Sequence, residues 1–214
     1  MTTNAPPSRN QAMDGTLMGA FSLFEAKLLQ NMEDMLPAIV IAYDRTTNRA
    51  QVQPLIVMVN TRNEQIERAQ IASVPVFQPG GGGFVISTPI QTGDIGWIKA
   101  NDRDISFFKK NYAQAAPNTQ RKHTFSDGVF IPDSFMRDVV INEEDATNLV
   151  IQNLAGTVRI AIWADKVKIT APAVILDTPL TTCTGDLLVQ GNTTMEGTLH
   201  VEGDVDFQTP RGWQ

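Results

Sequence analysis

The sequence is poor in cysteine and lacks a long apolar run. Cys183 is the only cysteine among 214 residues, which excludes an intrachain disulfide, and the chain needs no oxidising compartment to fold. No apolar stretch approaches the ~18 residues of a membrane span, and the N-terminus lacks a charged segment followed by an apolar one. We therefore expect a protein that is made and folded in the cytosol, with Cys183 as a packed structural thiol.

Basic charge and aromatic side chains are also scarce. The 17 Lys and Arg residues are outnumbered by 23 Asp and Glu residues, for a net charge of −6, and aromatic residues make up 7% of the chain. Nucleic-acid binders carry a Lys/Arg stripe, and none is visible, so nucleic acid is not an expected partner. Threonine, valine and glycine are frequent, which favours a mainly β protein of one or two domains.

The most informative feature present is a repeat near the C-terminus. Four consecutive hexapeptides begin with Gly185, Gly191, Gly197 and Gly203. Glycine permits a chain corner at each sixth residue, which is typical of β-helices. In an extended backbone alternate residues share a face, and one face of this repeat is apolar while the other is mostly acidic or polar. The predicted core positions on the apolar face are Leu187, Val189, Met195, Leu199, Val201, Val205 and Phe207.

The repeat is too short to form a β-helix from one chain. A hexad solenoid needs about three hexads per turn and roughly three or more stacked repeats to bury a core, and four hexads make little more than one coil. One copy would leave its apolar face in water and both strand edges unpaired. Three copies solve both problems if each supplies one wall of a prism and pairs its backbone with its neighbours. We therefore predict an intertwined homotrimer that forms a stiff rod.

Four regions are predicted along the chain. Residues 1–36 form a polar tail and an amphipathic helix, 37–105 a barrel of the oligonucleotide/oligosaccharide-binding (OB) type, 106–138 an irregular connector, and 139–214 a triple-stranded β-helix spike. The barrel is predicted from short strands near 38–43, 50–59, 71–77, 84–87 and 95–100.

The helix, expected over 14–35, has an apolar stripe at helical spacing. This stripe either packs on its own domain or docks to a partner, whereas membrane insertion is disfavoured because the polar face is not basic. Its candidate docking residues are Leu17, Phe21, Phe24 and Leu28.

Five segments of the predicted barrel resemble a known family. They are Leu36-Pro-Ala-Ile-Val-Ile-Ala-Tyr-Asp44, Asn48-Arg-Ala-Gln-Val-Gln-Pro-Leu55, Val74-Pro-Val-Phe-Gln-Pro-Gly-Gly81, Gly93-Asp-Ile-Gly-Trp-Ile98 and Asp102-Arg-Asp-Ile105. In this order and spacing they resemble the N-terminal domain of the Gp138-type membrane-piercing spike proteins of contractile phage tails, which are related to gpV-type spikes. The resemblance is close over 14–134 and architectural beyond it.

The resemblance implies a function and a set of partners. It implies a homotrimeric central spike in the tail baseplate of a virion, assembled in the host cytoplasm, with the barrel toward the tail hub and baseplate proteins. The rod would point away and be driven through the host outer membrane when the sheath contracts. The stripe of the N-terminal helix would then be a hub-docking surface.

The end of the chain departs from the family pattern. Family members often hold an axial iron with a His-x-His pair, but here the only late histidine is His200, on the polar face of the repeat. We therefore transfer no metal and predict no cofactor, although the resemblance leaves an axial ion open. The chain ends with Pro210 and Trp213, a blunt end that could accept a separate tip protein of the PAAR type.

Other candidate chemistry is weaker. Gly80 to Gly83 lack a following Gly-Lys-Ser/Thr and are interpreted as a barrel loop, not a phosphate cradle. Asp102 and Asp104 flank Arg103 and are interpreted as solvated or salt-bridged, not as a metal pair. The potential triad residues His123, Ser126 and Asp127 share one short loop with no strained turn to present the serine.

We therefore predict a structural protein and no enzyme. Three alternatives stay open: a left-handed β-helix acyltransferase with His200 as general base, the spike of a bacterial contractile secretion system, and a simple trimerisation device.

Overall fold

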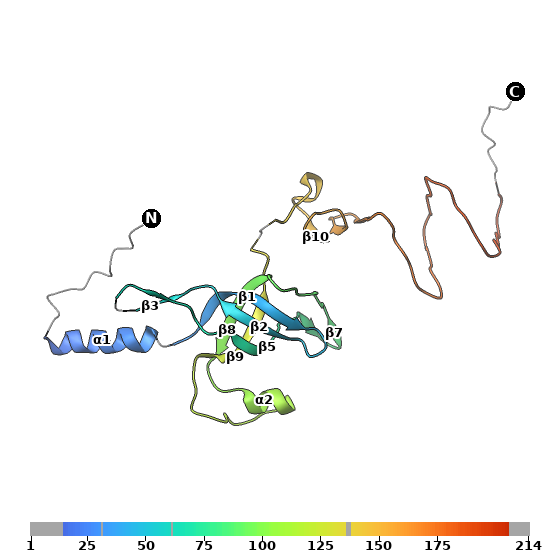
Figure 1. Cartoon of the computed structure of the whole chain (residues 1–214). Coiled ribbons are helices and arrows are strands. Elements are labelled where there is room, and N and C mark those ends of the chain that lie inside the picture. The colour runs from blue at the N-terminus through green and yellow to red at the C-terminus, as the bar shows by residue number, and fades with distance from the viewer. Residues whose placement is uncertain (1–14, 31, 61, 136–137, 206–214) are drawn as a thin grey trace. The chain divides into compact units, whose positions relative to one another are not determined.

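The computed structural model describes residues 15–30, 32–60, 62–135 and 138–205. The chain divides into two units, Met1–Thr170 and Ala171–Gln214, and Figure 1 shows that all helices and strands of the described residues lie in the first. The predicted tail over 1–13, Phe207 and the terminal Pro210 and Trp213 lie outside the described residues. No described helix has the length and hydropathy needed to cross a bilayer.

A five-stranded antiparallel sheet forms the centre of the first unit. Its strand order is β5-β2-β1-β8-β9. The strands are β1 (Met35–Asp44), β2 (Arg49–Pro54), β5 (Ile71–Pro75), β8 (Ile95–Asn101) and β9 (Thr124–Pro132).

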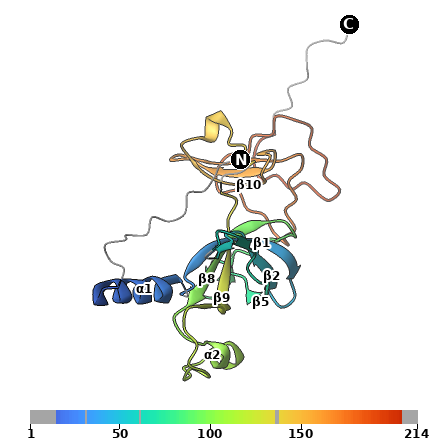
Figure 2. The same ribbon diagram turned by 60° about the vertical axis from the view of Figure 1, so that its left-hand side comes forward.

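The two edges of this sheet come together. Val76, directly after β5, forms a parallel bridge with Phe130 of β9, and the amide of Phe77 donates to the Phe130 carbonyl at 2.7 Å. The sheet therefore curls into a nearly closed barrel, as both views of the ribbon show (Figures 1 and 2). This confirms the expected mainly β, OB-like barrel.

The barrel is filled by small and β-branched side chains with two phenylalanines. Strand alternation buries every second residue of β2 and β8, as expected for strands with one face on a core. The core residues are Ala38, Val40, Ala50, Val52, Val74, Val76, Ile90, Ile98, Ala100, Phe125 and Phe130. At Gly96 a Cβ atom would collide with the Ile131 carbonyl and lie 2.6 Å from the Phe130 ring, so the packing of β8 on β9 requires glycine there.

Prolines and a tight turn bound several of the barrel strands, and the strand expected over 50–59 ends at Pro54. Pro54 ends β2, and Pro75 lies in β5 at the edge of the sheet. The turn between β1 and β2 is an Asx-type turn, because Asp44 Oδ1 accepts from the Thr46 amide at 2.9 Å.

The last barrel strand lies in the segment expected to be an irregular connector. β9 pairs with β8, and its Phe125 and Phe130 are among the largest fully buried side chains. The barrel sheet thus extends past residue 105, to Pro132. The sequence did not predict β9 for two reasons. A register shift opposite Lys99 and Asn101 breaks its alternation of apolar and polar residues, and Ser126-Asp127-Gly128 has the composition of a turn.

Short elements project from the barrel. The helix α1 (Leu17–Gln30) precedes it and is shorter than the predicted 14–35. The hairpin β3 (Met58–Val59) and β4 (Gln65–Ile66) follows β2, and the hairpin β6 (Gly80–Gly81) and β7 (Phe84–Val85) follows β5. The glycine loop is therefore a hairpin turn, with positive φ at Gly82 and Gly83. The helix α2 (Ser106–Asn111) lies between β8 and β9.

A second sheet follows the barrel in the sequence. It has three antiparallel strands in the order β10 (Leu149–Gln152), β11 (Arg159–Ile162) and β12 (Val167–Thr170), preceded by the short helix η2 (Glu143–Asp145). These strands lie in the region 139–214, which was expected to form the triple-stranded β-helix spike.

The second unit, described from 171 to 205, has no helix, no strand and no backbone-to-backbone hydrogen bond among its described residues. The predicted trimeric β-helix is not tested by this one copy of the chain.

Candidate assembly interface

The three-stranded sheet has one fully apolar face that is open to solvent. The strand register aligns Leu149, Ile162 and Val167 in one row and Ile151, Ile160 and Ile169 in the next. All six side chains are exposed, from 40% for Ile160 to 64% for Leu149. The predicted core list did not include these residues, although their alternation is visible in the sequence.

The opposite face of the same sheet is covered and includes a buried ion pair. Arg159 of β11 is 7% exposed and Asp145 of η2 is 1% exposed. Arg159 Nε donates to Asp145 Oδ2 at 2.7 Å, and Arg159 Nη2 donates to Glu144 Oε1 at 2.6 Å. Trp163 Nε1 donates to the other Asp145 oxygen at 3.2 Å. The segment containing η2 therefore covers the polar face of the sheet.

The ionisation of this cluster is fixed by its hydrogen bonds. The contact with Asp145 raises the pKa of Arg159, with a further contribution from Glu144. The Lys168 ammonium, 2.9 Å from Glu144, lowers the pKa of that carboxyl, and Arg159 adds to the effect. Arg159 and Glu144 are therefore both charged at neutral pH.

Taken together, the two faces are inverted relative to an ordinary globular sheet. Antiparallel sheets bury their apolar face and leave the polar face in water. Here the covered face holds an ion pair and the open face holds six aliphatic side chains in register. An exposed apolar patch of this kind typically marks an interaction surface.

The predicted core residues of the hexapeptide repeat are also exposed. Among the described ones, exposure runs from 47% at Val201 to 73% at Leu187. Cys183 is exposed as well. One copy of the chain thus leaves the apolar face uncovered over the described part of the repeat.

The hexad period extends further toward the N-terminus than the glycines indicate. The backbone bends at 172, 178–179, 184–185, 191, 196–197 and 202–203. Pro179 occupies the position six residues before Gly185 and is the signal in the sequence for this extension.

The corner glycines are not required by contacts within one copy. A Cβ atom at Gly185, Gly191, Gly197 or Gly203 would meet nothing within 4 Å, and none of the four has a positive φ. Any steric reason for glycine at these corners must therefore come from atoms of another copy.

The helix α1 has exposed apolar residues around its circumference. The candidate docking residues Leu17, Phe21, Phe24 and Leu28 are 48% to 75% exposed. Met18, Leu23 and Leu29 on other faces are exposed too. A helix that is apolar all round is normally buried, so this helix too is expected to have a partner.

The three residues of the potential catalytic triad each have a structural partner. His123 Nε2 lies 3.1 Å from Asp102 Oδ1, and Ser126 Oγ lies 3.1 Å from Thr124 Oγ1. Asp127 is buried beside Arg121. The three residues of the potential triad are therefore each engaged elsewhere.

Asp104 belongs to the same buried group as Asp127. It accepts hydrogen bonds from Ser106 and Thr119 and pairs with Arg121 at 3.1 Å. The hydrogen bonds from Ser106 and Thr119 hold the pKa of Asp104 well below its usual range. Asp102 pairs with Arg103 at 3.2 Å instead, so the two aspartates do not form a metal pair.

The fold and these surfaces define the chain as a small OB-like barrel followed by β segments whose apolar faces are open. Residues 36–133 match the family model for the phage protein Gp138 N-terminal domain. The match covers the barrel strands from Leu36 to Pro132, β9 included. It supports a phage protein of the Gp138 type and suggests a structural, virion-associated role. No curated protein matches the chain.

Proposed function

We propose that the chain is the central spike of a contractile phage tail baseplate, and that it works as a homotrimer that sheath contraction drives through the host outer membrane. The observation that carries the proposal is the inverted sheet β10–β12, whose open face is apolar and whose covered face holds the Arg159–Asp145 pair. The match of the barrel to a phage protein domain supports placing the chain in a phage particle.

Three copies explain the open surfaces better than two. Two copies could cover each other's β10–β12 face, but the residues after 171 would still have unpaired backbone groups, which are costly to bury. Three walls around an axis cover all the apolar faces and let each backbone pair with both neighbours. The bends recur every six residues, so each wall of the prism would consist of short straight segments about six residues long.

The repeat supplies the properties that a piercing rod needs. Each fully buried aliphatic side chain contributes about 1.5 to 3 kcal/mol, which keeps the axis dry. Bending the rod would break many backbone hydrogen bonds between the chains at the same time, and this makes the rod stiff. The outward-facing Asp186, Glu196, Glu202 and Asp204 keep the surface hydrated and repel anionic lipid head groups.

Under this proposal the chain is not an enzyme, and its end accepts a separate PAAR-like tip protein. An image of the tail tip that shows no density beyond residue 214 would refute the tip protein. The spike of a bacterial secretion system is physically equivalent and differs only in its apparatus.

The acyltransferase alternative has one candidate base, His200. It lies 3.7 Å from Glu202 and its side chain is 82% exposed, outside any described pocket. A His200→Ala variant that loses a measurable acyl-transfer activity would favour that alternative.

A truncation tests the proposal. The full chain should migrate as a trimer in sodium dodecyl sulfate without heating, and a variant lacking 185–214 should lose this resistance while its barrel stays folded by circular dichroism. A full-length chain that migrates as a monomer would refute the trimer. A truncated chain with equal resistance would refute the role of the repeat.

A further inference from the structure

The barrel has two ends that can be assigned from its topology. The segment 102–123 leaves β8 after Asn101 and returns at Thr124, the first residue of β9, whereas the chain leaves β9 for the later sheet at Pro132. A nine-residue strand separates these points by roughly 30 Å. We call the end at Thr124 the proximal end and the end at Pro132 the distal end.

The N-terminal helix joins the barrel at the proximal end. The amide of Glu33, just after α1, donates to the His123 carbonyl at 3.0 Å. The Glu33 carboxylate accepts from the Phe125 amide at 2.6 Å and from Arg68 at 3.2 Å. A hollow of about 290 Å³ lies beside these groups, lined in part by Met58, Ile71 and Phe125.

The residues 105–126, here called the basic segment, differ in charge from the rest of the chain. They include Lys109, Lys110, Arg121 and Lys122 and no Asp or Glu, in a protein of net charge −6. The residues 171–205 show the reverse, with five acidic residues and no Lys or Arg.

The basic segment is held in a fixed position on the barrel. Arg121 lies between the buried carboxylates of Asp104 and Asp127, at 3.1 and 3.3 Å, and Asn101 Nδ2 donates to the Asp127 carbonyl at 2.5 Å. Arg121 is therefore neutralised by its partners, and Asp104 and Asp127 also lie near Lys109, together with Arg49.

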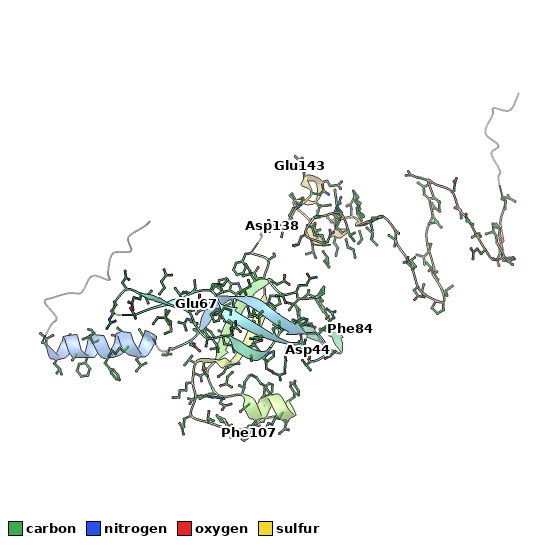
Figure 3. The ribbon with its side chains drawn as sticks, in the orientation of Figure 1. Asp44, Glu67, Phe84, Phe107, Asp138 and Glu143 are labelled. Carbon is green, nitrogen blue, oxygen red and sulfur yellow. The ribbon has the colours of Figure 1, made fainter. Side chains whose placement is uncertain are left out.

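The remaining cations stand beside exposed rings. Among the described residues, Lys110 and Lys122 have no carboxylate within ion-pair distance, and Lys110 lies 5.8 Å from the Phe107 ring centroid. Phe107 is 40% exposed, and Tyr112 is 77% exposed. Figure 3 shows Phe107 on α2, outside the barrel sheet.

We propose that the basic segment is a docking surface for an acidic protein of the phage tail, with Lys110 and Lys122 contacting carboxylates and the α2 rings covering apolar surface. The proposal rests on the proposed function, in which the proximal end faces the tail. Charge complementarity selects an acidic partner. The helix α1, which joins the barrel at the same end, has exposed apolar side chains on more than one face, which fits a protein groove better than a membrane surface, where one face would stay polar.

The test uses tail particles prepared from a phage in which the gene for this chain is interrupted. The purified full chain is added, the particles are sedimented, and the bound chain is measured. The Lys110→Glu/Lys122→Glu variant is compared with Lys110→Arg/Lys122→Arg, which keeps the charge, and with Arg45→Glu/Lys166→Glu, which makes the same charge change elsewhere.

The charge reversal should reduce binding to the particles about tenfold or more, while both controls bind like wild type and all variants keep the wild-type mass in solution. Equal binding of the charge-reversed variant would overturn the proposal. The proposal would also be overturned if the charge-reversed variant lost binding to phosphatidylglycerol vesicles but still bound the particles. That result would show that the basic segment contacts a membrane surface. A wild-type chain that is monomeric or does not bind the particles would refute the proposed spike function itself.

Discussion

The Ile160→Ala substitution tests whether the open face of β10–β12 is the trimer interface. Ile160 lies at the centre of one apolar row, between Ile151 and Ile169, and is 40% exposed in one copy. Full burial of such a side chain is worth about 1.5 to 3 kcal/mol, so covering the exposed share contributes about 0.6 to 1.2 kcal/mol per copy. Three copies give roughly 2 to 4 kcal/mol.

This free energy predicts a measurable change in association. At 1.4 kcal/mol per factor of ten, the equilibrium constant for trimer dissociation should rise roughly 30-fold to 700-fold. Sedimentation over a range of concentrations measures it. The matched control is Ile86→Ala, the same truncation at an exposed site after β7. Unchanged dissociation for Ile160→Ala, or an equal effect of Ile86→Ala, would refute the assignment of this face.

Three further predictions concern the folded chain. Gly96→Ala should destabilise the barrel by about 1 to 3 kcal/mol or more, because the new methyl group collides with β9; a thermal unfolding midpoint equal to wild type would contradict this packing. The pKa of Asp104 is lowered from 3.8 in the folded chain, so its contribution to stability is present at neutral pH and is lost as the pH falls below 3.8. Asp104→Asn should therefore lower the free energy of unfolding at pH 7 and flatten its dependence on pH in acid. A pH profile parallel to that of wild type would contradict this role. Arg159→Met should lower the thermal stability because it leaves Asp145 buried without its cation, and Asp145→Leu in the same chain should restore part of the loss; equal stability of the single variant would show that the pair is not needed.

Much of the barrel was predictable from the sequence because its strands obey local rules. Short strands were predicted close to the positions of β1, β2, β5 and β8, although the strand expected over 50–59 ends at Pro54. Strand β9 was missed because its pairing is interrupted and because its buried Asp127 interrupts the apolar pattern. Its partners are set by tertiary contacts with β8 and with Val76, which no local pattern contains.

The candidate interface was predictable only in part. The hexapeptides revealed an apolar face, and glycine marked four of the bends. The bends at 172 and 178–179 fall at proline and threonine, so a search for regularly spaced glycines does not detect them. The inverted character of β10–β12 depends on Asp145 reaching Arg159 from 14 residues away, and such a pairing becomes visible only in three dimensions.

The central claim is that the residues after 171 obtain their backbone hydrogen bonds from other copies of the chain. Amide hydrogen exchange on the full-length protein tests it directly, since the described residues from 171 to 205 contain no backbone-to-backbone hydrogen bond in one copy. In the trimer, the amides from 185 to 205 should be strongly protected, to a degree comparable with the barrel strands. Exchange at the rate of an unstructured peptide in that segment would contradict it.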